Sequence, residues 1–134
     1  MKKILIIDDE KTVSAALTFA LERVGHQIVE IQNPLDVLAK LKEENFHLLI
    51  LDYNINFLSG ADIIKLIKNN NIHIPIVIIS SQNAEEIISL KFSINTSIVY
   101  LSKDQPILEI VKEIEKLLLI ANQNQYQGGS YAEN

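Results

Sequence analysis

Four short apolar segments, each followed by a polar or charged residue, constrain the fold of this 134-residue chain more than any other feature. They lie at residues 4–7, 48–51, 76–79 and 98–101. Strands that are apolar throughout are typical of a parallel sheet that helices cover on both faces. Open parallel sheets bind ligands at the carboxyl ends of their strands. We therefore expect one edge of the sheet to gather the polar residues that follow these segments: Asp8, Asp9, Asp52, Ser80 and Lys103.

Helical patterns separate the strand segments. In residues 10–24 apolar residues recur at the spacing of one helix face, and Gly25 stands where helices commonly end. Asn33 and Pro34 suit the N-cap and first turn of a second helix to about residue 44. A further strand at 27–31 and helices at about 61–68, 83–91 and 105–121 complete the pattern. This alternation predicts an α/β fold with a five-stranded, doubly wound parallel sheet, (β/α)5, and right-handed crossovers.

Length and composition fit one domain followed by a short polar segment. A chain of 134 residues, 48% hydrophobic and 22% charged, can bury a core without disulfides or metals. We place the domain at residues 1–121. Residues 122–134 are rich in Gln, Asn and Gly, and we interpret them as a flexible tail or a truncated linker.

Composition also excludes several classes of protein. The chain has no cysteine, so it forms neither disulfides nor a thiolate zinc site. No segment approaches the roughly 20 apolar residues of a membrane span, and we expect a cytoplasmic protein without membrane insertion. The formal net charge is -5 and the basic residues are dispersed, which argues against direct nucleic-acid binding and favours protein partners. His26, His47 and His73 lack metal-ligand spacing and are interpreted as structural or exposed.

The acidic pair Asp8 and Asp9 follows the first strand segment. Carboxylates held close together repel each other, and a divalent cation relieves that repulsion. Mg²⁺ prefers such oxygen ligands together with waters and a substrate phosphate. The same residues, with Glu10, would also favourably cap the N-terminus of the next helix. The pair alone leaves both interpretations open.

Asp52, Ser80 and Lys103 each have an ordinary interpretation as well as a chemical one. Carboxylates accept phosphoryl groups in covalent catalysis, but a single aspartate at a strand end is also a common turn residue. Similarly, Ser80 alone fits a turn hydroxyl and Lys103 alone fits a solvated cation. Together they offer a hydroxyl and a cation to phosphate oxygens. Their joint occurrence on the predicted strand ends favours a metal and phosphate site.

Over about residues 2–120 the chain resembles the receiver domain of two-component response regulators, the CheY-like group with a flavodoxin-like arrangement. That family carries an acidic pair, an acceptor aspartate, a hydroxyl residue and an aromatic–lysine pair at the ends of strands one, three, four and five. The matching residues are Asp8 with Asp9, Asp52, Ser80, and Tyr100 with Lys103. The spacing from Asp52 to Gly60 also agrees with the family's phosphorylation loop.

The resemblance implies a role for each matching residue. Asp52 would accept a phosphoryl group from the phosphohistidine of a sensor histidine kinase or phosphotransfer protein. Mg²⁺ or Mn²⁺ would be held by Asp9, Asp52 and the backbone carbonyl of Asn54, with Asp8 helping directly or through water. Ser80 and Lys103 would bind phosphate oxygens. Movement of Ser80 would let Tyr100 turn inward and change the surface that a downstream effector protein or output domain recognises.

The resemblance also implies a phosphoacceptor rather than an enzyme. Asn54 and Gln82 occupy the positions that tune dephosphorylation in the family. Neither is charged here, so we predict slow to moderate self-dephosphorylation.

Three positions depart from the family pattern. Asn56 stands where proline is usual, Thr96 and Ser97 replace a Gly–Ala pair, and Lys103 is followed by Asp104 rather than proline. The family's Lys–Pro peptide is commonly cis. A cis bond before a non-proline residue costs about 2.5–4 kcal/mol, so we predict a trans bond after Lys103 and a shifted lysine.

Two other function classes remain as alternatives. The departures are compatible with a pseudo-receiver, an interaction module that keeps the fold but does not use phosphorylation. A Mg-dependent phosphatase with an aspartyl nucleophile would need an Asp-x-Asp pattern and a substrate-enclosing insertion, which Asp8-Asp9-Glu10 and the chain length do not offer. Leu108, Leu119 and Ile120 lie off the core stripe of the last predicted helix, so we expect a monomer or a phosphorylation-dependent dimer.

Overall fold

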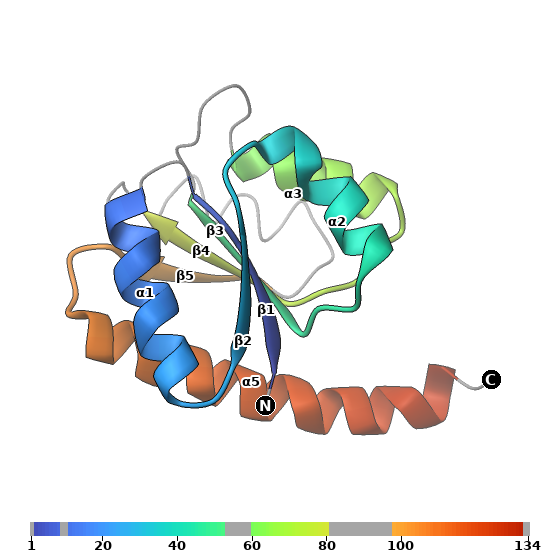
Figure 1. Cartoon of the computed structure of the whole chain (residues 1–134). Helices are drawn as coiled ribbons and strands as arrows, with labels where there is room; N and C mark the ends of the chain where they lie inside the picture. Colours follow the sequence, from blue (N-terminus) through green and yellow to red (C-terminus); the bar gives the residue numbers. More distant parts are fainter. Residues whose placement is uncertain (1, 9–10, 53–59, 81–97, 133–134) are drawn as a thin grey trace.

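Five parallel strands form the sheet that the apolar segments predict (Figure 1). They are β1 (Lys3–Ile7), β2 (Gln27–Ile31), β3 (Leu48–Asp52), β4 (Ile76–Ser80) and β5 (Ile98–Ser102), in the order β2-β1-β3-β4-β5. The computed structural model describes residues 2–8, 11–52, 60–80 and 98–132. Strands β3, β4 and β5 each continue one residue past the predicted end, so Asp52, Ser80 and Ser102 belong to the sheet itself.

The described helices follow the predicted order. They are α1 (Lys11–Arg23), α2 (Val37–Glu43), α3 (Gly60–Asn69) and α5 (Ile107–Ala132). The helix predicted at about 83–91 lies outside the described residues. Gly25 follows α1 with a φ of 100°, a left-handed conformation that glycine adopts without steric cost. Asn33 acts as the predicted cap, since its side chain accepts a hydrogen bond from the Leu35 amide at 3.0 Å, but it caps a short 3-10 turn, Pro34–Asp36, that precedes α2.

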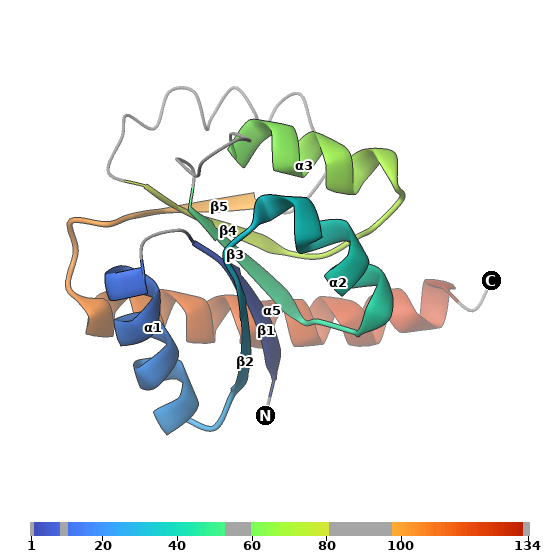
Figure 2. The same ribbon diagram turned by 45° about the horizontal axis from the view of Figure 1, so that its top comes forward.

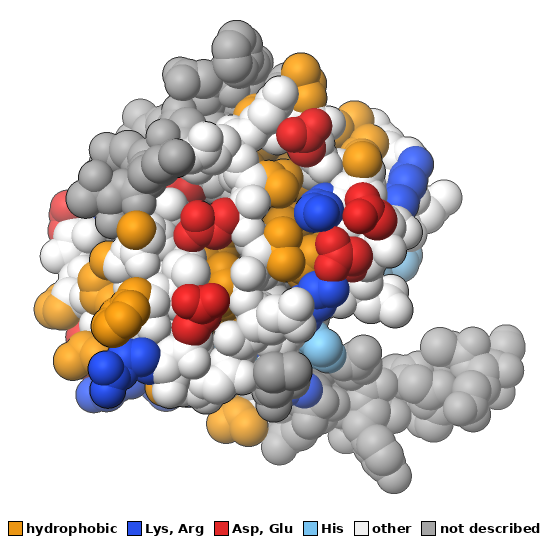
Figure 3. Space-filling view, viewed as in Figure 1, with side chains coloured by type: hydrophobic (Ala, Val, Ile, Leu, Met, Phe, Trp, Pro, Cys, Tyr) orange, Lys and Arg blue, Asp and Glu red, His pale blue; other side chains and the backbone are white. Residues whose placement is uncertain are grey.

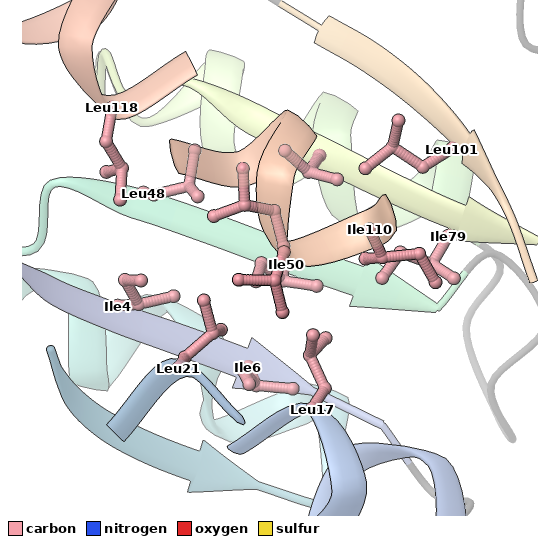
Figure 4. Packing of buried hydrophobic residues seen from close by; sticks show 13 residues of the cluster. Ile4, Ile6, Leu17, Leu21, Leu48, Ile50, Ile79, Leu101, Ile110 and Leu118 are labelled. Carbon is pink, nitrogen blue, oxygen red and sulfur yellow. The ribbon is translucent and has the colours of Figure 1, made fainter. Parts of the chain in front are cut away.

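The helices cover both faces of the sheet. α1 and α5 lie on one face and α2 and α3 on the other, as Figures 1 and 2 show from two directions. Alternate residues of each strand feed the two cores, because successive side chains of a strand point to opposite faces. On the α1/α5 face, Leu17 and Leu21 from α1 and Ile110 and Leu118 from α5 pack on strand residues such as Ile50 (Figure 4). The other face buries Leu51, Ile63, Ile64 and Ile78, among others.

The C-terminal helix corrects one expectation. We predicted that the last helix would end near Ala121, but the described backbone is helical to Ala132. The interpretation of residues 122–134 as a flexible tail or truncated linker stays a prediction. In both ribbon views this last part of α5 extends past the sheet. Adding residues to a helix that has already nucleated costs little free energy. The polar composition of this segment does not reveal that effect. The domain boundary at residue 121 stays a prediction.

The surface carries mixed charges and scattered apolar side chains. On the face seen in Figure 3, acidic side chains lie beside apolar ones, and the Lys and Arg side chains are dispersed rather than gathered into one patch. Leu108, Leu119 and Ile120 of α5 are exposed, as their position off the core stripe predicts. Among the described helices, none combines the length and apolar character that crossing a membrane requires.

Candidate functional site

Two buried carboxylates meet at the carboxyl edge of the sheet. Strands β1 and β3 are neighbours, and Ile7 pairs with Leu51, so Asp8 and Asp52 follow at the same level of adjacent strands. Adjacent strands lie about 4.8 Å apart. Asp8 is only 8% exposed and Asp52 only 4%. The predicted convergence of the first and third strand ends is therefore present in the fold.

Lys103 contacts Asp52 directly. Its ammonium nitrogen, Nζ, donates a hydrogen bond to Asp52 Oδ2 at 2.8 Å, and the two side chains are 17% and 4% exposed. An unpaired carboxylate buried to this degree would be strongly destabilising. The lysine offsets that cost and holds a cation beside the carboxylate. The two residues come from β3 and from the turn after β5, which are separated by β4.

Ser80 links Tyr100 and Lys103 at the end of β4. Ser80 is 1% exposed, and its backbone carbonyl accepts hydrogen bonds from two donors. These are the Lys103 amide at 3.0 Å and the Tyr100 hydroxyl at 3.1 Å. Tyr100 is half-buried and packs against the core on the α2/α3 face. The sheet thus holds three of the predicted site residues within one hydrogen-bonded group.

Several predicted site residues lie outside the described part of the chain. They are Asp9, Asn54 and Gln82, together with the departures Asn56, Thr96 and Ser97. Their assigned roles stay predictions. The trans geometry predicted after Lys103 is confirmed, since the described residues contain no cis peptide bond. The lysine nevertheless reaches Asp52.

The donor chemistry of the site fits Mg²⁺. Mg²⁺ is commonly held by one or two carboxylates, waters and substrate phosphates, and Asp8 and Asp52 supply two buried carboxylates. Within the described ranges no group of three or more acidic or histidine side chains gathers into a complete metal cage. The two described carboxylates are therefore compatible with a magnesium site.

Sequence reasoning missed Ser102. Its hydroxyl oxygen, Oγ, accepts a hydrogen bond from the Asp104 amide at 3.1 Å, across the turn that carries Lys103. The sequence could have indicated this turn, because a serine hydroxyl often accepts a hydrogen bond from the backbone amide two residues later. It also missed that His26 and His47 accept hydrogen bonds from the backbone amides of Lys2 and Lys3, at the start of β1; the sequence had left them as structural or exposed.

Comparisons with known proteins agree with this geometry. A model of the response regulator receiver domain matches residues 4–115. The chain is 30% identical over 103 residues to the chemotaxis protein CheY1 of Helicobacter pylori J99, covering 72% of this chain and 83% of that protein. It is 29% identical over 124 residues to the transcriptional regulatory protein ResD of Bacillus subtilis, covering 92% and 51%.

Solved structures show the same fold. A two-component response regulator from Clostridium difficile is 28% identical with a TM-score of 0.77, covering 89% of this chain and 96% of that one. The receiver domain of the Francisella response regulator 1452 superposes with a TM-score of 0.78 at 24% identity, covering 88% and 97%. The chain spans about half the length of ResD and 35% of PhoP, the alkaline phosphatase synthesis regulator of B. subtilis.

Proposed function

Because this chain belongs to the receiver domain family of two-component response regulators, we propose that it accepts a phosphoryl group on Asp52 from a phosphohistidine of a partner kinase or phosphotransfer protein. Receiver domains are generally phosphoacceptors rather than catalytic enzymes, and they typically bind Mg²⁺ at an acidic pocket. The observation that supports the proposal most is the buried Asp52 carboxylate, which is level with Asp8 just after β1 and is bonded to Lys103 at 2.8 Å.

The proposed reaction needs positioning more than acid–base chemistry. An oxygen of the Asp52 carboxylate attacks phosphorus while the bond from phosphorus to the histidine nitrogen breaks, and the released imidazole takes up a proton from solvent. Asp8 and Asp52, with Asp9 and the Asn54 carbonyl, would hold Mg²⁺ or Mn²⁺. When bound, the cation would neutralise charge on the transferred phosphoryl group. Lys103 then exchanges its contact with the carboxylate for one with the new phosphate oxygens.

The hydroxyl of Ser80 and the ring of Tyr100 are the proposed switch. Phosphorylation would add about -1.5 to -2 charges beside the end of β4, and the hydroxyl of Ser80, the last residue of that strand, would donate to the phosphate. Because Tyr100 bonds the backbone of the same residue, a change at Ser80 reaches the Tyr100 ring directly. The surface near β5 and α5 would then differ between the two states, and an effector protein or output domain would read that difference.

The partners that we propose are proteins. A sensor histidine kinase or phosphotransfer protein would supply the phosphoryl group in the cytoplasm, and an effector protein or output domain would receive the signal. The dispersed basic residues do not favour direct contact with nucleic acid by this domain. The exposed side chains of Leu108, Leu119 and Ile120 offer a surface for a phosphorylation-dependent dimer, with a monomer as the alternative.

Intact-protein mass spectrometry tests the phosphoacceptor role. The purified chain is incubated with Mg²⁺ and a small acyl phosphate or phosphoramidate, and we expect a gain of one phosphate. The gain should disappear in Asp52→Asn and persist in Asp36→Asn, a control carboxylate in the turn before α2. After donor removal we expect the phosphate to persist for longer than seconds. Absence of any gain while a partner protein still binds would favour the pseudo-receiver instead.

A further inference from the structure

The position of Lys103 depends on the turn that follows β5. Ser102 is the last residue of β5 and pairs with Ser80 on β4. Lys103 is the first residue beyond the sheet, and its amide is anchored to the Ser80 carbonyl. Its side chain must cross the end of β4 to reach Asp52 on β3, a span of about two strand spacings, or roughly 10 Å. A small rotation of the turn would therefore separate the ammonium from the carboxylate.

Nothing in the covalent structure of residue 104 fixes this turn. A proline would lock its own φ near -65°, whereas Asp104 keeps its backbone freedom and its N–H group. That N–H donates to Ser102 Oγ at 3.1 Å, which closes a hydroxyl-to-backbone turn around Lys103. Lys103 thus lies between an amide bonded to β4 on one side and a turn closed by Ser102 on the other.

We propose that Ser102 is a positioning residue, whose hydroxyl holds the Lys103–Asp104 turn so that the lysine ammonium rests on Asp52. Ser102 does not itself contact the phosphoryl group in this proposal. The assignment concerns the contact between Lys103 and Asp52. Its consequence for phosphoryl transfer rests on the proposed function.

A double-mutant cycle tests the contact without any phosphorylation. Urea unfolding at neutral pH in EDTA is measured for the unmodified chain, Lys103→Met, Asp52→Asn and the double variant. The four free energies of unfolding give the coupling free energy between the two side chains. The cycle is repeated with Ser102→Ala and with Ser102→Thr. We expect Ser102→Ala to remove at least half of the coupling and Ser102→Thr, which keeps the hydroxyl, to restore it. An unchanged coupling in Ser102→Ala would overturn the proposal.

A matched control separates positioning from general stability. Thr18 on α1 donates its hydroxyl to Glu30 on β2, the edge strand that β1 separates from β3. Thr18→Ala also deletes a hydroxyl and its hydrogen bond. It should lower the urea midpoint slightly without altering the Lys103–Asp52 coupling. An equal loss of coupling in Thr18→Ala would show that the Ser102 effect is not local, and would also overturn the proposal.

Phosphorylation kinetics supply the second readout. With a small phosphodonor, Ser102→Ala should slow phosphoryl gain by about tenfold, less than the roughly 100-fold loss that a 1 Å misplacement can cause. The serine substitution should have no further effect in Lys103→Met. If the unmodified chain gains no phosphate, the proposed function fails while the coupling result still decides the role of Ser102.

Discussion

At the scale of single residues, the site holds charges that the fold alone would not favour. Asp8 and Asp52 are carboxylates buried at adjacent strand ends, where like charges repel and dehydration penalises both. Lys103 is hydrogen-bonded to Asp52 and offsets part of this cost. Active sites commonly keep such destabilising groups because their chemistry requires them.

Replacing Asp8 should therefore stabilise the metal-free fold. We expect Asp8→Asn to raise the free energy of unfolding in EDTA by about 0.5–2 kcal/mol, because it removes a charge beside Asp52. The same variant should lose most of the stabilisation that Mg²⁺ gives to the unmodified chain. Thermal unfolding with and without Mg²⁺ measures both effects. A variant that is destabilised in EDTA and still stabilised fully by Mg²⁺ would contradict this account.

The sequence allowed part of this site to be predicted. Asp8, Asp52, Ser80 and Lys103 could be placed together because an all-apolar strand ends at a recognisable residue and parallel strands end at one edge. The contact of Lys103 with Asp52 and the turn closed by Ser102 could not, because they depend on backbone angles at residues 102–104 that no apolar pattern encodes.

At the scale of elements, helix ends were the least predictable feature. The strands agreed with their predicted bounds to within one residue. For β1, β3 and β4 the reason is that burial on both faces requires an uninterrupted apolar run. The predicted end of α5 did not agree with the structure. Gly128 and Gly129 each disfavour a helix by about 1 kcal/mol, so the composition of the segment after Ala121 argued for an earlier end than the observed one. Continuation of a long helix past the residues that anchor it is a cooperative effect, which local composition does not reveal.

Among the α5 side chains whose burial the structure describes, which end at residue 120, four anchor the helix on the sheet. Ile110, Val111, Ile114 and Leu118 are buried against the sheet. We therefore expect a chain shortened to residues 1–121 to unfold at the same urea concentration as the full chain, within error. A chain ending at Lys116 loses Leu118, which is 3% exposed, and should be destabilised by about 2–5 kcal/mol. A large loss already in the 1–121 chain would place the domain boundary further along the helix.

At the scale of the whole molecule, the amino edge of the sheet has its own polar arrangement, opposite the acidic pocket. His26 Nδ1 accepts a hydrogen bond from the Lys2 amide at 3.2 Å, and His47 Nδ1 accepts one from the Lys3 amide at 3.0 Å. The outer nitrogen of His26 contacts Glu115 of α5. Lys3 also pairs with Glu44 and lies over the Phe46 ring. Both histidines must be unprotonated at Nδ1 to accept these bonds.

This arrangement predicts a loss of stability in mild acid. Burial, and next the charge of Lys2, lower the pKa of His47 below its ordinary value of 6.5. As the pH falls below the ordinary pKa of 6.5, His47 in the unfolded chain binds a proton more readily than His47 in the native chain. The free energy of unfolding therefore decreases as the pH falls through this range. We expect the free energy of unfolding to decrease between about pH 7 and pH 5. The pKa of Glu44 is also lowered, first by its hydrogen bond with Lys3. This shift changes the free energy of unfolding only below the usual pKa of 4.5, which is outside the range from pH 7 to pH 5.

His47→Asn isolates the contribution of His47. The asparagine oxygen can replace Nδ1 as acceptor but does not titrate, so the decrease between pH 7 and pH 5 should become smaller. His73→Asn, at an exposed histidine before β4, should leave the pH dependence unchanged. Urea unfolding at several pH values measures all three chains. Identical curves for the chain with His47 and for His47→Asn would exclude this histidine as the titrating group.

Strand β1 runs from the histidine edge to the acidic edge, with Lys2 and Lys3 near one end and Asp8 at the other. Five residues of strand separate the histidines at its amino end from the carboxylate at its carboxyl end, where we propose that a divalent cation binds. In the range where the carboxylates stay ionised, the two variables should be thermodynamically separable. Stability mapped over pH and Mg²⁺ concentration should then be a sum of two one-variable functions, with no cross-term between them.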